Sequence, residues 1–209
     1  MIRPHQIFIA ILITLLGCNQ AKNQKITADL NAQTLKPELI INSTDSETSS
    51  EVDCIRGAAE PIIRKSVFPD SNFKLQSDKI TGIETVNFDN GGKLIIKNWG
   101  CEYYCLTFRF ETTRFQEDTT NLQFWYKKSV LLISEILNGL EAPTDIKKGT
   151  NSLVNYIDLD LPNNYVNLKL KDEIDFGGED IREYVTLDRI QKIDDKKYAI
   201  EISYITGPL

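Results

Sequence analysis

The stretch Thr81–Gly100, "TGIETVNFDNGGKLIIKNWG", predicts a β-hairpin and decides the fold class. Two runs rich in β-branched and large apolar residues flank a turn that contains Asn90 and Gly91. Asn-Gly readily adopts the positive φ angles that a tight hairpin turn requires. We therefore expect the two runs to pair as antiparallel strands, and the rest of the chain must fit an antiparallel sheet.

The segment after the hairpin, "EYYCLTFRFET" (102–112), predicts a long strand with two different faces, because successive side chains of a strand point to opposite sides. The face expected in the core carries Tyr104, Leu106, Phe108 and Phe110. The opposite face carries Tyr103, Cys105, Thr107, Arg109 and Glu111. Upstream, "DSNFKLQ" (70–76) predicts a short strand. A short helix is expected to begin near Pro61, because proline is tolerated only in the first turn of a helix.

The segment "TNLQFWYKKSVLLISEILNGL" (120–140) changes to a helical period. Thr120 and Gln123 have the spacing of a capping box, and Gly139 and Pro143 mark the end of the helix. The residues at helical spacing are Trp125, Leu132, Ile133, Ile136, Leu137 and Leu140. This wide apolar stripe predicts one long helix that packs across a face of the sheet.

The C-terminal part returns to strand patterns. "YVNLKLK" (165–171) alternates and predicts a strand with Val166, Leu168 and Leu170 directed inward. "EYVTLDRIQKI" (183–193) and "KYAIEISYI" (197–205) flank "DDKK" and predict a second hairpin. Strand hairpins, one long helix near 120–140 and a C-terminal strand meander together predict an α+β fold with a largely antiparallel sheet.

The N-terminal apolar run Ile7–Leu16 is too short to span a membrane. As a helix, its ten residues measure roughly 15 Å, which is about half the hydrocarbon thickness of a bilayer. A basic residue, Arg3, precedes the run, and a polar tract follows Cys18. This layout is typical of a secretory signal peptide.

The end of that run, Leu15-Leu16-Gly17-Cys18, resembles the lipobox of bacterial lipoproteins. The resemblance implies that the thiol of Cys18 receives a diacylglyceryl group, that the chain is cut before it, and that the new amine is acylated. Several acyl chains hold a protein stably on a membrane, whereas one holds it marginally. The implied location is the bacterial cell envelope, facing the periplasm. In enterobacterial lipoproteins, an Asp just after the cysteine tends to retain the protein at the inner membrane. This chain has Asn19 at that position, which favours the outer membrane.

These observations divide the chain into three parts. Residues 1–17 are the expected lipoprotein signal peptide, 18–50 the lipidated cysteine and a flexible tether, and 51–209 a single α+β domain large enough for its own core. The tether is rich in Asn, Gln, Ser, Thr and Lys. "LKPELII" (35–41) interrupts it, and the sequence leaves open whether this segment docks on the domain as a further strand or stays loose.

Charge and histidine content exclude several function classes. Removal of the signal takes away Arg3 and the single histidine, His5, which leaves 23 basic against 30 acidic residues, a net charge of −7. We therefore expect no nucleic-acid partner and no polybasic contact with anionic lipid. A mature chain without histidine has no Ser-His-Asp or Cys-His catalysis and no imidazole metal site.

The acidic clusters give no positive sign of a metal or catalytic site. Carboxylates gather in "KDEIDFGGED" (171–180) and in "DLDLPNN" (158–164), which includes Asp158 and Asp160. Their spacing does not match an EF-hand, and solvated turns explain them. A glycosidase needs two carboxylates at a set separation, and nothing in the sequence selects a pair. We expect no cofactor, no metal and no catalytic residue.

Aromatic residues supply the candidate binding sites. They cluster around one predicted strand and the helix: Trp99, Tyr103, Tyr104, Trp125 and Tyr126. Most are expected in the core, but Trp99 beside Gly100 and Tyr126 beside Lys127 are expected to be partly exposed, and aromatic side chains are enriched at binding hot spots.

The leading hypothesis is a non-enzymatic, protein-binding envelope lipoprotein, which includes an immunity or inhibitor role. The alternatives are a carboxylate-dependent peptidoglycan hydrolase and a structural lipoprotein that binds the cell wall.

Three cysteines remain for the domain, and an oxidising periplasm favours a disulfide among them. Because three is odd, one thiol is left over. Cys101 and Cys105 are separated by roughly 13 Å in the predicted strand, beyond the roughly 7 Å that a disulfide bridges. Cys54 is therefore expected to pair with one of them. Cys101 is preferred, because Gly100 and the end of the strand leave room there, and Cys105 then remains a buried thiol.

Overall fold

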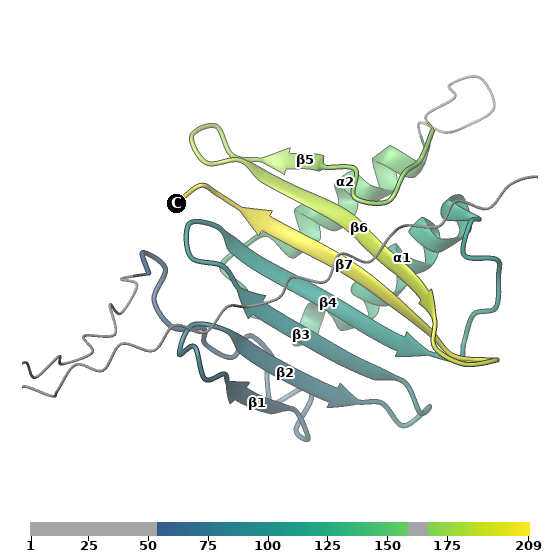
Figure 1. Cartoon of the computed structure of the whole chain (residues 1–209), viewed down its shortest axis with the longest axis horizontal. Helices are drawn as coiled ribbons and strands as arrows, with labels where there is room; N and C mark the ends of the chain where they lie inside the picture. Colours follow the sequence, from purple (N-terminus) through teal and green to yellow (C-terminus); the bar gives the residue numbers. More distant parts are fainter. Residues whose placement is uncertain (1–53, 159–166) are drawn as a thin grey trace, which may run out of the picture. The chain divides into compact units, whose positions relative to one another are not determined.

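Seven strands form one antiparallel sheet in the computed structural model, which describes residues 54–158 and 167–209 (Figure 1). Their order across the sheet is β1-β2-β3-β4-β7-β6-β5. The strands are β1 (Asn72–Leu75), β2 (Gly82–Asn87), β3 (Lys93–Trp99), β4 (Tyr104–Thr112), β5 (Ile174–Gly177), β6 (Glu183–Lys192) and β7 (Tyr198–Thr206). The helices are α1 (Leu122–Ile136), which continues into a short 3-10 turn (Leu137–Gly139), and α2 (Ile146–Asp158). An antiparallel sheet with helices confirms the predicted α+β class at this level.

The β2–β3 hairpin forms where the Asn-Gly turn predicts it. The backbone N–H of Phe88 donates to the carbonyl of Gly92 at 2.9 Å, and Gly91 has a φ of +78°. The side-chain oxygen of Asn90 accepts from the N–H of Gly92. The β6–β7 hairpin also forms as predicted, and it brings β7 beside β4 at the centre of the sheet.

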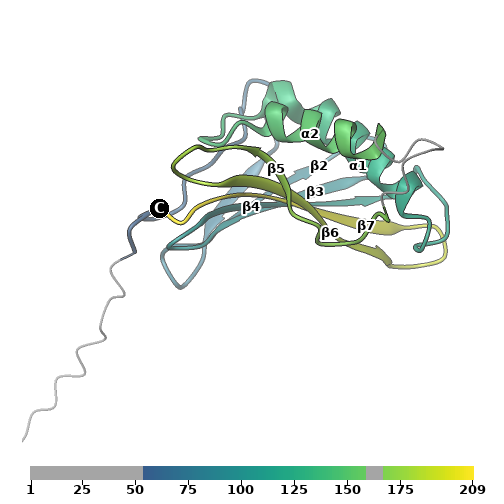
Figure 2. The ribbon, with the colours of Figure 1, turned by 90° about the horizontal axis from the view of Figure 1, so that it is seen from above.

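Both helices lie on the same face of the sheet (Figure 2). Residues of β3, β4, β6 and β7 that face the helices are fully buried: Leu94, Ile96, Leu106, Phe108, Val185, Leu187, Ile200 and Ile202. From α1, Trp125 and Ile133 are also fully buried. The predicted core face of β4 is confirmed from Leu106 to Phe110, while Tyr104 at its start is only half-buried. In the described ranges, no helix has the length and apolar character needed to cross a membrane.

The start of α1 differs by one residue from the predicted capping box. The N-cap is Asn121, whose side-chain oxygen accepts from the N–H of Phe124 at 3.2 Å. Thr120 instead donates its hydroxyl to Asp118. Both Thr and Asn are good N-cap residues, so spacing alone does not choose between neighbours.

Helix α2 is an addition to the elements that the sequence predicts. Its buried residues Ile146, Leu153 and Ile157 recur at helical spacing, but Gly149 and two asparagines lower its helix propensity. Gly149 lies directly against the ring of Tyr204. The helix packs against α1 and β5, and this packing stabilises a segment whose local sequence favours helix weakly.

The helix expected near Pro61 is absent from the described structure, and an extended strap (54–64) takes its place. The N–H groups of Ile62 and Ile63 donate to the carboxylate of Glu84 at 2.9 and 3.2 Å. Ile63 also forms a bridge with Leu140. Because these groups have partners outside the segment, the strap does not need helical hydrogen bonds.

The prediction of a strand over 165–171 is also wrong. The structure describes residues 167–171 of this segment, and they form no strand. Leu168 is buried, but Leu170 is exposed, and Val166 lies outside the described residues. One backbone bond, from the N–H of Lys171 to the carbonyl of Leu187, joins this segment to β6. Strand β5 occupies the edge of the sheet beside β6. The alternation of apolar and polar residues in 167–171 therefore reflects partial burial of the segment and does not indicate a strand.

Candidate functional site

The face of the sheet opposite the helices carries a mixed lining of polar, charged and apolar side chains. On β4 these are Thr107, Arg109 and Glu111, all half-buried. On β3 they include Lys97 and Trp99, both exposed. Figure 1 looks onto this face, and Figure 2 shows that neither α1 nor α2 covers it. We call it the helix-free face.

Two adjoining depressions, each of about 550 Å³, form a trough on the helix-free face. Trp99 and Ile205 line both depressions and so join them. The charged half crosses from β2 to β6, and its charged side chains are Lys97, Arg109, Lys171, Asp188, Arg189 and Glu201. The aromatic half lies at the β3–β4 turn and contains Tyr103 and Tyr184.

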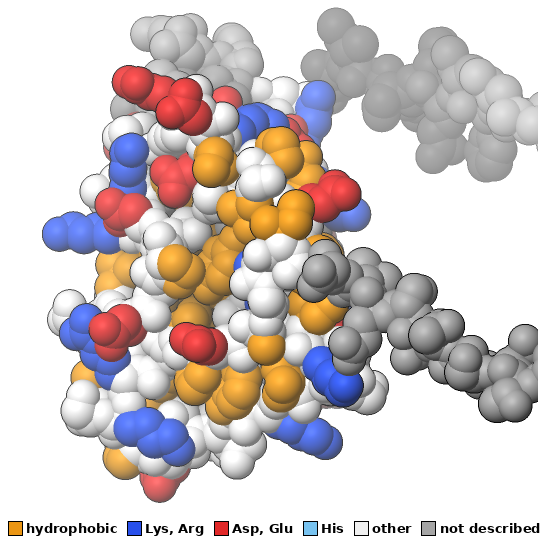
Figure 3. All heavy atoms as spheres, turned by 90° about the vertical axis from the view of Figure 1, so that its left-hand side faces the viewer, with side chains coloured by type: hydrophobic (Ala, Val, Ile, Leu, Met, Phe, Trp, Pro, Cys, Tyr) orange, Lys and Arg blue, Asp and Glu red, His pale blue; other side chains and the backbone are white. Residues whose placement is uncertain are grey.

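The aromatic half belongs to an end of the molecule where apolar side chains gather. Figure 3 faces this end and shows hydrophobic side chains in the centre with charged side chains around them. Trp99, Tyr103, Ile181 and Leu209 are all large hydrophobic residues that remain exposed. Apolar surface rimmed by charge is typical of an interaction site.

A row of hydrogen bonds fixes the floor of the trough across four strands. The indole N–H of Trp99 donates to the hydroxyl of Thr107 at 3.1 Å, and that hydroxyl lies 2.8 Å from the hydroxyl of Ser203. Ser203 donates to Asp188, which also accepts from Thr186 at 2.6 Å. Asp188 stands at a bulge of β6, between Leu187 and Arg189. The row therefore orients Trp99 through a partly buried network.

A second row, which consists of ion pairs, runs from the charged half of the trough toward the far end of β4. Arg109 contacts Glu201 at 2.6 Å and Glu111 at 3.1 Å. Lys197 contacts Glu111 at 3.1 Å, and Arg189 lies 3.8 Å from Glu201. Burial works to raise the pKa of Glu111, but hydrogen bonds from Lys197 and Arg109 outweigh it and lower the pKa. The ionised carboxylate of Glu111 therefore holds Lys197 and Arg109 in place near neutral pH.

Of the two predicted binding residues, Trp99 lies in the trough and Tyr126 does not. Trp99 is 37% exposed, and Nζ of Lys97 lies 4.6 Å from the centre of its ring. Tyr126 is fully buried, and its hydroxyl donates to the carbonyl of Lys169 at 2.7 Å. Burial raises its pKa. The expectation that Tyr126 is partly exposed is therefore wrong, and we do not assign it a binding role.

The cysteines lie beside the aromatic half of the trough. Cys54 is joined to Cys101 with their Cα atoms 5.2 Å apart, and Cys105 is a free, buried thiol whose pKa is raised by burial. The chain turns at Gly100, which has a φ of +96°, and β4 begins only at Tyr104. The predicted strand from residue 102 is therefore two residues too long.

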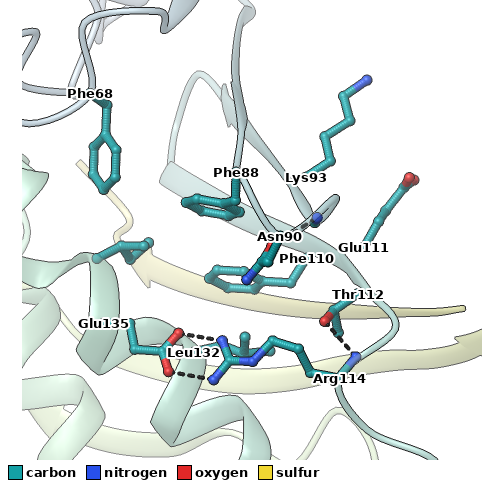
Figure 4. Close-up of a pocket in the computed structure, with 12 residues that line it drawn as sticks. Phe68, Phe88, Asn90, Lys93, Phe110, Glu111, Thr112, Arg114, Leu132 and Glu135 are labelled. Atoms are coloured by element: carbon teal, nitrogen blue, oxygen red, sulfur yellow. Dashed lines mark hydrogen bonds and ion pairs between the residues drawn. The ribbon is translucent and has the colours of Figure 1, made fainter.

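A separate aromatic pocket of about 230 Å³ lies between the sheet and α1 (Figure 4). Phe68, Phe88 and Phe110 line it, and Arg114 closes one side through two hydrogen bonds of 2.6 Å to Glu135. This ion pair lowers the pKa of Glu135. The pocket suits a small apolar group. Its aromatic residues come from distant segments, and no local motif of the sequence could predict it.

Three of the five acidic residues of 171–180 have protein partners. Glu173 and Asp175 both contact the guanidinium of Arg182, the latter at 2.7 Å. Asp172 accepts from the hydroxyl of Tyr156 at 2.6 Å. Across the described part of the chain, no group of three or more His, Cys, Asp or Glu side chains is placed to hold a metal ion. Asp160 lies outside the described residues.

No family model, curated protein or solved structure matches this chain. The trough is the larger of the two sites, and it contains the exposed tryptophan that the sequence singles out.

Proposed function

We propose that this protein is an envelope lipoprotein, anchored through Cys18, whose domain binds another protein through the helix-free face. The observation that carries the proposal is Trp99, a large exposed aromatic side chain at the junction of the two halves of the trough. Tryptophan, tyrosine and arginine dominate binding hot spots, and Tyr103 and Arg109 line the same trough.

The immobilisation of Trp99 supports a binding role. The hydroxyl of Thr107 accepts a hydrogen bond from the indole N–H of Trp99, and Nζ of Lys97 lies over the indole ring. A side chain that is already held in place loses little rotamer entropy when a partner covers it. The trough is also open and extends over several strands, which fits a protein surface better than a small molecule.

The anchor follows from the lipobox resemblance of Leu15-Leu16-Gly17-Cys18. On this proposal, residues 1–17 are removed, acyl chains on Cys18 enter the membrane, and the outer membrane is the favoured address. Cys18→Ser should abolish incorporation of radioactive palmitate and leave unprocessed precursor or a soluble form. Cys105→Ser, a serine replacement at a cysteine outside the lipobox, should label normally. A Cys18→Ser protein that remains membrane-bound and labelled refutes the anchor.

Photo-crosslinking tests the binding role. A photoreactive amino acid at position 99 should give one discrete protein adduct in intact envelopes, and an excess of the wild-type domain should compete it away. The control places the same amino acid at Leu131, which is 39% exposed on α1. Equal adducts at both positions, or no protein adduct at position 99, contradict binding through the helix-free face.

The rival functions give different results with purified peptidoglycan. Release of soluble fragments indicates a hydrolase. Co-sedimentation without cleavage, together with no protein adduct at position 99, indicates a structural lipoprotein that binds the cell wall. Both outcomes replace the proposal.

A further inference from the structure

The charged half of the trough is more positive than the protein as a whole. The chain has a net charge of −6. Its charged half nevertheless has four cations against two carboxylates, and the aromatic half adds one carboxylate, Glu102. The cations are Lys97, Arg109, Lys171 and Arg189. A positive trough on an acidic protein attracts anionic groups to this face.

The two carboxylates of the charged half are already engaged. Glu201 contacts Arg109 and Arg189, and Asp188 accepts hydrogen bonds from Thr186 and Ser203. Lys97 and Lys171 are exposed, and neither forms a salt bridge with any residue in the described ranges. Lys97 and Lys171 are therefore the two cations of the charged half that no carboxylate of the described residues pairs.

The position of both lysines is fixed by backbone. Lys97 belongs to β3 and is paired with Ile83 and Thr107 on the neighbouring strands. The N–H of Lys171 donates to the carbonyl of Leu187 at 2.8 Å, which ties Lys171 to β6. The two cations thus lie on opposite sides of β4 and β7, with the floor of the trough between them.

We propose that the trough binds an extended acidic polypeptide segment of the partner protein. From β2 to β6 the trough crosses four strand spacings, roughly 19 Å, which accommodates about six extended residues. Carboxylates of the segment contact Lys97, Lys171 and Arg189, and an apolar side chain packs against Trp99 and Ile205. This inference rests on the proposed protein-binding function and names the chemistry of its partner.

The lining favours a polypeptide over a polyphosphate. Asp188 and Glu201 lie among the cations, and they would repel a ligand with a charge at every repeat. A peptide spaces its carboxylates and supplies an apolar side chain for the aromatic half. The net negative charge of the chain also opposes nucleic acid.

Intrinsic fluorescence provides a direct readout. The chain has two tryptophans, and Trp125 is fully buried, so a change of emission on binding reports Trp99. A short oligoglutamate peptide with one central leucine should change the emission saturably, and salt should weaken its binding. The matching oligolysine peptide should give no change. Equal binding of both peptides overturns the proposal.

Charge reversal separates the trough from net charge. The double substitution Lys171→Glu with Arg189→Glu should weaken binding of the acidic peptide by about tenfold or more. The double substitution Lys127→Glu with Lys147→Glu makes the same change of charge on exposed positions of α1 and α2 and should leave binding unchanged. Equal weakening by both pairs shows that only net charge matters, which overturns the proposal. Urea unfolding midpoints verify that each variant folds.

The outcomes also distinguish this inference from the proposed function. A protein adduct at position 99 without binding of the acidic peptide leaves protein binding intact and refutes the acidic partner. Peptide binding without a protein adduct in envelopes refutes the proposed function. A third outcome is that the protein binds purified peptidoglycan and that Lys171→Glu with Arg189→Glu abolishes this binding. The cations of the trough would then contact carboxylates of the cell wall, which likewise refutes the acidic polypeptide.

Discussion

Glu84 is a buried carboxylate that joins the strap to the sheet. It is 3% exposed, and it accepts the N–H groups of Ile62 and Ile63. Burial raises its pKa, against the opposing effect of these two hydrogen bonds. Strand alternation in β2 predicts that position 84 faces the core, because Val86 does. Its partners are more than twenty residues upstream, and no spacing rule identifies them.

The raised pKa of Glu84 predicts a specific dependence of stability on pH. A folded-state pKa above the ordinary value of about 4.3 means that the native state binds this proton more tightly. The resulting stabilisation is complete below the ordinary pKa and is lost as pH rises through the folded-state pKa. Glu84→Gln removes this titration and places an amide NH₂ near backbone donors. The substitution should therefore lower the free energy of unfolding by about 1–3 kcal/mol.

Urea unfolding of wild type and Glu84→Gln at about pH 4 and about pH 7 measures the effect. The loss of unfolding free energy in the variant should be larger at the lower pH. Glu179→Gln, at an exposed turn, should change stability by less than about 0.5 kcal/mol at either pH. A loss that grows with pH would mean that Glu84 is stabilised in its ionised form.

The two candidate binding residues show what a sequence determines at this scale. Trp99 precedes Gly100 at the end of a strand, where side chains on one face have no helix above them, and the prediction of exposure holds. Tyr126 precedes Lys127 on a helix, where neighbours are rotated by about 100°. The exposure of Lys127 therefore carries no information about Tyr126, which packs against Tyr156.

At the scale of elements, hairpins and the long helix are predictable because their signals are local. Asn90-Gly91 determines its turn, and the apolar period of 120–140 determines α1. Helix α2 and the segment 167–171 depend on contacts with distant residues. The edge beside β6 has room for one strand, and Ile174 and Phe176 of β5 bury more apolar surface there than Leu168 alone.

Gly149→Ala tests how closely α2 packs on the sheet. Helix propensity alone predicts a gain of about 1 kcal/mol. A Cβ at this position, however, would lie 2.7 Å from Cε1 of Tyr204, whose buried ring is held by a hydrogen bond with Thr150. Overpacking of a buried site costs about 1–3 kcal/mol, so we expect the substitution to lower the unfolding free energy.

The matched control is Asn155→Ala, on the exposed side of the same helix. It should raise the unfolding free energy by about 0.5 kcal/mol. Thermal or urea unfolding of both variants gives the comparison. If Gly149→Ala stabilises the protein as Asn155→Ala does, α2 has space above Tyr204 and the packing described here is wrong.

Across the entire domain, the two faces of the sheet differ because both helices lie on one of them. The helix-covered face contains the core, and the opposite face contains the trough. The strap connects the two faces, since it begins at Cys54 beside the aromatic half and reaches Leu140 beyond α1. The alternation of β4 predicts that such a second face exists. It does not predict the trough, which needs side chains from five strands.

The pairing of Cys54 with Cys101 closes a long covalent loop, across 47 residues of sequence. In the chain-entropy model, a loop of this length lowers the entropy of the unfolded state by an amount worth about 4 kcal/mol. The double substitution Cys54→Ser with Cys101→Ser should therefore reduce the unfolding free energy by up to about 4 kcal/mol. Cys105→Ala, which removes a thiol outside the loop, should lower the unfolding free energy by only about 1 kcal/mol.

Peptide mapping without reductant should recover Cys54 joined to Cys101, with the thiol of Cys105 reactive only after unfolding. A peptide that joins Cys101 to Cys105, or three free thiols in exported protein, would contradict this pairing and detach the strap from the trough.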